Sequence, residues 1–152
     1  MYKLVTPILD FDVRRLCFKA YYNHPKGCPN YNKKIGCPPT SKTIDKKIDL
    51  NKSVYAVWNK FDFASHCKRM KSKHPDWTIR QVECCLYWQS KARKQLKKYI
   101  CEFLSEHRNF IIVNCPEGGG VNLTATMKNI GINLEWPPKN ITYQIVLAGY
   151  KI

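Results

Sequence analysis

Apolar and β-branched stretches, separated by polar turn residues, predict four strands along the chain. Residues 53–61 and 141–150 are rich in Val, Ile and aromatic residues, and residues 110–113 are continuously apolar. Such segments are typical of strands. A further short strand over residues 2–9 ends near Pro7. With helical segments between these strands, we expect one small α+β domain built on a short mixed sheet.

The strongest helical periodicity lies in residues 77–107. Thr78 and Gln81 match the capping box that begins many helices. Apolar residues then recur on one face at helical spacing: Val82, Cys85, Leu86, Ala92, Leu96, Tyr99, Ile100 and Phe103. We therefore predict one long amphipathic helix.

Two shorter helices are predicted before it. Residues 63–74 form a helix that stops before Pro75, because the residue preceding a proline is steered out of the helical region. Another begins with Thr40 or Ser41 as its N-cap and continues to about Leu50.

Composition adds a large positive charge. The chain has 26 Lys and Arg against 11 Asp and Glu, for a net charge of +15. Such an excess favours a polyanionic partner, and we expect nucleic acid, DNA rather than RNA. The alternative is a basic surface that serves only solubility.

Cations and one aromatic residue also share a face of the predicted long helix. Positions spaced alternately by four and three residues predict the nucleic-acid contacts Arg80, Tyr87, Lys91, Lys94 and Lys98, with Cys84 in the same row. The preceding helix adds Lys68, Arg69, Lys71 and Lys73. The alternative is an ordinary solvated helix face.

Residues 17–39, CFKAYYNHPKGCPNYNKKIGCPP, form a turn-rich segment with almost no apolar periodicity. Such a segment cannot order itself by burying surface, so we expect a metal to hold it through Cys17, Cys28 and Cys37. Thiolate-rich sites suit zinc or, alternatively, an iron–sulfur cluster. The other possibility is three free thiols.

A fourth ligand has to come from elsewhere. Cys115, at the end of a predicted strand, is our first candidate, with Cys84 and then His24 as alternatives. Cys85 falls on the apolar face and is predicted to be a core thiol.

The stretch CPNYNKKIGCPP resembles the signature of an uncharacterised family of predicted metal-binding proteins, which carry C-P-x-Y-G…C-P-P near the N-terminus. The later stretch CPEGGGVNLTATMKNIGINL is also similar to that family. The resemblance implies metal ligands at Cys28 and Cys37 and extends to Cys17 and Cys115. This chain differs in having Asn32 after the tyrosine and in lacking the family's later cysteine cluster.

Residues 110–131 predict a strand, a glycine turn and a helix that Gly131 ends. Backbone N–H groups beside glycines form an anion site, so we expect Glu117, Gly118, Gly119 and Gly120 to bind a cofactor such as S-adenosylmethionine. The alternative is a tight turn with nothing bound.

Together these features predict a metal-containing enzyme that modifies nucleic acid. The first hypothesis is methyl or other one-carbon transfer to a base, such as a 7-deazaguanine in phage DNA. The alternatives are a non-catalytic zinc-stabilised DNA- or RNA-binding module and an iron–sulfur redox protein. No apolar run is long enough to span a bilayer and no signal-peptide core is present, so we expect no membrane partner and a cytoplasmic location, in the host cytoplasm if the chain is viral.

Overall fold

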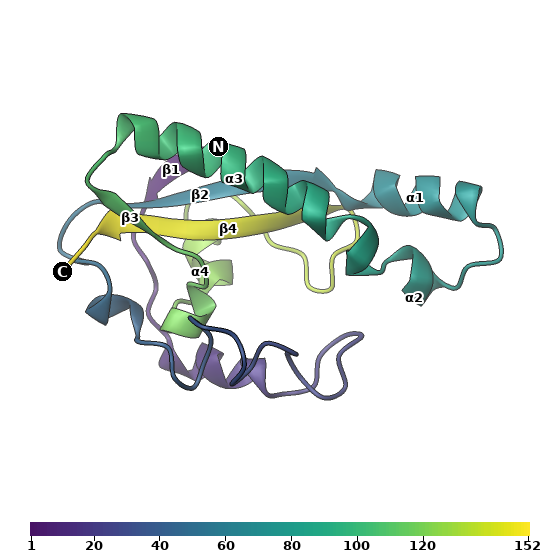
Figure 1. Ribbon diagram of the computed structural model, residues 1–152, viewed down its shortest axis with the longest axis horizontal. Helices are drawn as coiled ribbons and strands as arrows, with labels where there is room; N and C mark the ends of the chain where they lie inside the picture. The colour runs from purple at the N-terminus through teal and green to yellow at the C-terminus, as the bar shows by residue number, and fades with distance from the viewer.

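A computed structural model describes residues 1–152 and shows an α+β domain built on one four-stranded sheet (Figure 1). The strand order is β1-β2-β4-β3, with the bounds Tyr2–Val5 for β1, Val54–Asp62 for β2, Phe110–Val113 for β3 and Ile141–Tyr150 for β4. All four predicted strands are present.

The sheet is entirely antiparallel, so the prediction of a mixed sheet was wrong. The strands β2 and β3 do run parallel to one another, as their long helical connection allows. However, β4 comes last in the chain and inserts between them, antiparallel to both. Its N-terminal half pairs only with β2, because β3 reaches no further than Leu147.

Side chains alternate between two cores on the two faces of the sheet. The helix α3 (Gln89–Glu106) covers one face, where Leu96 and Phe103 pack on Val57 and Val146. The other face packs against α4 (Leu123–Lys128) and the loops around it (Figure 1). The members of that second core are Val5, Ile44, Ile48, Val54, Ala56, Trp58, Val113, Val121, Leu123, Met127 and Leu147.

Asn59 joins α3 to the two central strands. Its side chain is fully buried; Nδ2 donates to the carbonyl of Ala92 at 2.7 Å, and Oδ1 accepts from the backbone N–H of Gln144 at 2.9 Å. A buried amide with both ends satisfied fixes the position of α3 as well as contributing to stability.

The predicted helix over residues 77–107 is broken into three pieces. They are α2 (Ile79–Val82), the 3₁₀ helix η3 (Cys85–Tyr87) and α3. The capping box of Thr78 and Gln81 is confirmed, but Leu86 is 80% exposed and Cys85 is also exposed rather than in the core.

Trp88 causes the break. Its ring stacks on Phe61 at 5.1 Å and meets Phe63 edge-on at 5.6 Å, and its indole N–H donates to the carbonyl of Glu83 at 3.3 Å. Burying this large side chain against the end of β2 overrides the helical periodicity, and α3 begins directly after it.

The helices α1 (Phe63–Lys73) and α4 match their predictions, and Gly131 has the left-handed φ of +86° expected after a helix end. The predicted helix from Thr40 or Ser41 to Leu50 is only the short 3₁₀ helix η2 (Ile44–Lys46). Backbone pairing competes with it, because the N–H of Asp49 donates to Tyr150 at 2.8 Å.

Candidate metal site and nucleic-acid interface

Cysteines from three separate segments approach one another on the α4 side of the sheet, namely Cys17, Cys28, Cys37 and Cys115. Cys17 ends the 3₁₀ helix η1 (Phe11–Cys17), and its carbonyl accepts from the N–H of Cys28 at 2.8 Å. A Cβ built on Gly118 would lie 2.8 Å from the Sγ of Cys115 and 3.1 Å from the ring of Pro38. Cys115 therefore lies close to the residue that follows Cys37.

Polar bonds hold these segments together. Arg14 donates to the carbonyls of Pro39 and Ser41 at 3.2 and 2.8 Å, and the hydroxyl of Ser41 donates to the carbonyl of Gly118 at 3.1 Å. The N–H of Asp10 donates to Gly120 at 2.8 Å. The loop before β2 and the turn after β3 thus form one unit around the thiols.

The charges of neighbouring groups affect the pKa values of these thiols. Burial raises the pKa of Cys17, and the nearby Cys28, Cys37 and Glu117 raise that pKa further. The pKa of Cys115 is likewise raised to about 11, mainly by burial. The charges of Glu117, Cys37 and Cys17 add to the rise, whereas a hydrogen bond from Gly118 lowers the pKa. A cation placed among these groups would reverse this preference and favour the thiolates.

The four thiols are all half-buried and free of disulfides. No three Cys, His, Asp or Glu side chains are arranged closely enough to hold a metal ion as they stand. Of the alternative fourth ligands, His24 stacks on Tyr21 at 4.5 Å, and Cys84 precedes η3. Cys115 is the candidate that interacts with Cys17 and Cys37.

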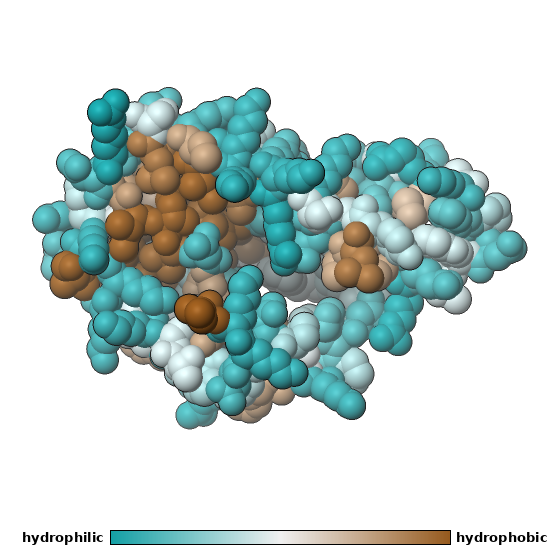
Figure 2. Space-filling model, viewed as in Figure 1, coloured by the Kyte–Doolittle hydropathy of each residue, from teal (hydrophilic) through white to brown (hydrophobic).

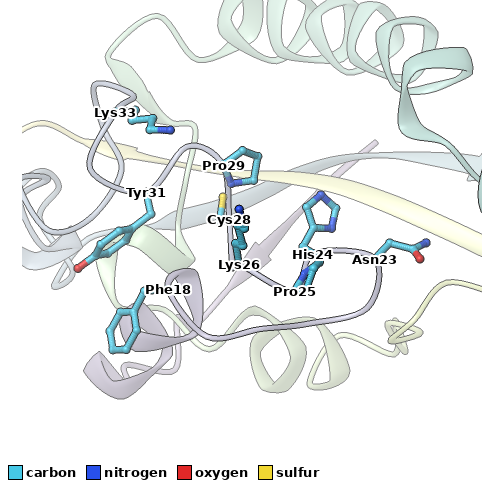
Figure 3. A pocket seen from close by; sticks show the side chains of 10 residues that line it. Phe18, Asn23, His24, Pro25, Lys26, Cys28, Pro29, Tyr31 and Lys33 are labelled. Atoms are coloured by element: carbon cyan, nitrogen blue, oxygen red, sulfur yellow. The ribbon is translucent and has the colours of Figure 1, made fainter.

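A hollow of about 480 Å³ opens inside the cysteine loop (Figure 3). The rings of Phe18 and Tyr31 lie 5.6 Å apart at one end, and Asn23 and His24 lie at the other. Cys28 forms part of the wall of this hollow.

The glycines of residues 117–120 serve close packing. A Cβ on Gly119 would meet Ile44 at 3.3 Å, and one on Gly120, whose φ is +88°, would overlap the ring of Phe11. The N–H groups of Gly119 and Gly120 already donate to backbone carbonyls within the turn. The cofactor predicted at Glu117–Gly120 therefore gains no free donor from Gly119 or Gly120, and it stays a prediction.

The predicted row of cations does not lie on one helix, because the predicted helix over residues 77–107 is broken. Lys91, Lys94 and Lys98 remain on the exposed side of α3, and Lys98 lies 3.9 Å from Glu102. Arg80 and Tyr87 instead lie on α2 and η3, which extend with α1 beyond the end of the sheet (Figure 1).

An aromatic stack accompanies these cations, and sequence reasoning missed it. Trp77 stacks on His74 at 4.0 Å, with the planes 9° apart, and meets Tyr87 at 5.0 Å. The only signal in the sequence was a pair of aromatic residues flanking the Pro75-Asp76 turn.

Most of the positive charge lacks an acidic partner. The three ion pairs are Arg15–Asp12, Lys52–Asp49 and Lys98–Glu102. Between Phe63 and Lys98 the chain has ten Lys or Arg residues and two acidic ones. Figure 2 shows mostly hydrophilic side chains over α1 and α2, a small apolar cluster near the beginning of α3, and a larger apolar area over β3 and the end of α3.

No family model matches this chain, and comparisons with curated proteins and with solved structures find no match either. The similarity at CPNYNKKIGCPP therefore stays a resemblance. None of the helices is long and apolar enough to cross a bilayer.

The packing role of the glycine turn has a direct test. We expect Gly120→Ala to lower the free energy of unfolding by roughly 3 kcal/mol, because it adds left-handed strain and a clash with Phe11. Gly131→Ala is the matched control: its φ is +86° but nothing lies within 4 Å of the added methyl group, so about 1 kcal/mol is expected. Urea unfolding of both variants measures the difference, and equal losses would contradict a packed turn.

Proposed function

We propose that this chain is a nucleic-acid-binding protein whose cysteine loop is held by a zinc ion. The observation that carries the binding function is the concentration of unpaired cations on α1–α3. About a quarter of the chain, from Phe63 to Lys98, carries more than half of the net charge of +15. Cations on neighbouring helices repel one another, and the charges of a phosphate backbone relieve that repulsion. Binding also releases the counterions condensed on the nucleic acid.

The aromatic stack supports a nucleic acid over another polyanion. Tyr87 is 52% exposed at the end of the stack with Trp77 and His74, and Arg80 lies on the adjoining α2. Rings that lie among cations suit bases stacked beside a phosphate backbone.

The donor set suits zinc. Charges on Cys28 and Cys37 raise the pKa of Cys17, and charges on Cys37 and Cys17 raise that of Cys115. Soft thiolate ligands select zinc or iron–sulfur clusters. Bound zinc would keep Cys17, Cys28, Cys37 and Cys115 as thiolates and would serve as a structural staple, since four protein ligands leave no open position for a substrate. An iron–sulfur cluster is the alternative for the same cysteines.

Binding is proposed here in preference to methyl transfer to a base. Methyl transfer needs a cofactor next to the acceptor base, and the turn at Glu117–Gly120 is filled by Ile44 and Phe11. The cations and the aromatic stack are sufficient for binding alone.

Metal content tests the staple. Protein purified without oxygen is expected to contain one zinc per chain, and Ser in place of Cys17, Cys28, Cys37 or Cys115 to reduce that content and the thermal stability together. Cys101→Ser, in an exposed cysteine on α3, is the matched control and should change neither. Elemental analysis and calorimetry measure both quantities. A metal-free parent protein, or full zinc content in the four variants, would refute the staple, whereas iron with visible absorption would identify a cluster.

Salt dependence tests the interface. Affinity for a DNA oligonucleotide is expected to fall with salt, and Lys91→Gln with Lys94→Gln to reduce the slope of log K against log salt by about 1 for each lysine that contacts phosphate. Lys128→Gln removes one lysine charge on α4, across the sheet from α3, and should leave the slope unchanged. Fluorescence anisotropy measures the slopes. A parent protein whose binding ignores salt would contradict the proposed function.

A further inference from the structure

A second hollow, of about 180 Å³, lies at the open edge of β4. Tyr143 and Gln144 both line it, although consecutive residues of a strand point to opposite faces of the sheet. The hollow therefore lies at the strand's edge. One edge of β4 is covered by β2, and β3 pairs only with Leu147–Tyr150, so the edge beside Ile141–Gln144 on the β3 side is open.

The walls of this hollow are aromatic. Trp88 is buried on the α3 side, while Trp136 on the opposite loop is 68% exposed. The indole N–H of Trp136 donates to the hydroxyl of Thr124 at 3.2 Å, which holds the ring in place without covering it. Tyr143 adds a third ring. Because the ring of Trp88 already packs on Phe61 and Phe63, the rings left to a planar ligand are those of Trp136 and Tyr143.

The wall also holds an unused hydrogen-bond acceptor. Oε1 of Gln144 is buried and has no partner. Its strand position is fixed, because its backbone N–H donates to Asn59, which in turn donates to Ala92. Buried polar groups in folded proteins are nearly always paired, so this acceptor, on a residue that lines the hollow, leaves a place for a donor that the protein does not supply. Gln89 places a second carboxamide in the same wall.

The loop that closes the hollow is held rigidly. The carboxylate of Glu135 accepts from the backbone N–H groups of Lys139 and Asn140 at 2.9 and 2.7 Å, and from Nδ2 of Asn140 at 3.1 Å. These bonds hold the loop that carries Trp136, so the cavity is formed before a ligand arrives.

We propose that this hollow binds one unstacked base of a single-stranded nucleic acid. Its volume lies below the roughly 300 Å³ at which pockets begin to hold drug-sized ligands, which suits a single ring system. Aromatic walls stack on a base, and every base has an N–H donor on its Watson–Crick edge for the carboxamide of Gln144. The site thus recognises a base with little sequence preference.

Cations surround the hollow where a phosphate backbone would pass. Lys60 pairs with Tyr143 in the β2–β4 register, Lys139 lies in the closing loop, and Arg93 lies one turn beyond Gln89 on α3. The inference rests on the proposed nucleic-acid binding and deepens it, because it places one base at a defined site. Charge favours this occupant over an extended peptide paired with the free edge of β4.

The test compares a single-stranded 12-mer with a strand of the same length made wholly of abasic sites. Both carry the same phosphates, so their affinity ratio isolates the bases. The parent protein is expected to prefer the normal strand by roughly tenfold or more, as stacking on aromatic side chains provides. Trp136→Ala and Gln144→Leu should each lower this ratio at least threefold and leave affinity for the abasic strand unchanged.

Phe18→Ala is the matched control, because it removes an exposed aromatic ring of the cysteine loop that belongs neither to this hollow nor to the stack of His74, Trp77 and Tyr87. Thermal unfolding checks that each variant is folded, and the comparison of strands on the parent protein needs no variant. Equal affinity of the parent protein for both strands would overturn base binding in this hollow. So would an affinity ratio that both Trp136→Ala and Gln144→Leu leave unchanged, and a peptide paired with the free edge of β4 would then be the remaining occupant. Failure to bind either strand would instead refute the proposed function itself.

Discussion

The segment between β1 and η2 lacks a hydrophobic anchor, and the arrangement of the α4 side of the sheet depends on what replaces it. Between the buried residues Val5 and Ile44, the only other buried residues are Gly27 and Pro38. Backbone ordering costs about 1–2 kcal/mol per residue, and this stretch buries almost no apolar surface to offset that cost. Its order therefore depends on hydrogen bonds to the turn after β3 and, in our account, on a metal held by cysteines from both.

The two sides of the sheet have different tasks in this account. The cysteine loop and α4 lie on one face, and α3 lies on the other with most of its cations exposed (Figure 1). The side chain of Tyr22 connects the two regions by donating to Glu83, just after α2, at 2.8 Å. Order in the cysteine loop therefore also supports the end of α2, beside the cations and aromatic rings proposed to contact nucleic acid.

Local signals predicted the elements that tertiary packing left undisturbed. The four strands, α1, α4 and the capping box at Thr78 follow from side-chain periodicity and turn residues, which the fold respects. The break before α3 did not follow, because it depends on a pocket for Trp88 that Phe61 and Phe63 create only after folding. The position of β4 between β2 and β3 is likewise a long-range choice.

The candidate sites likewise divide into those that local sequence signals predicted and those that depend on long-range packing. Cysteine spacing and turn composition singled out Cys17, Cys28 and Cys37, and its place at the end of a predicted strand made Cys115 the first candidate for the fourth ligand. In the structure these cysteines lie near one another. The hollow at Trp136 and Gln144 joins one loop, the start of α3 and the edge of β4, and no spacing of residues in the sequence indicates it. Glycine residues at 118–120 suggested a ligand, whereas they allow Ile44 and Phe11 to pack closely.

X-ray absorption spectroscopy of the zinc-loaded protein tests the central claim most directly. The account predicts a zinc shell of four sulfur atoms at about 2.3 Å, and a shell with one sulfur replaced by oxygen or nitrogen when Cys115 is changed to Ser. A parent shell made mainly of nitrogen and oxygen, or an identical shell in Cys115→Ser, would contradict a staple that joins the cysteine loop to the turn after β3.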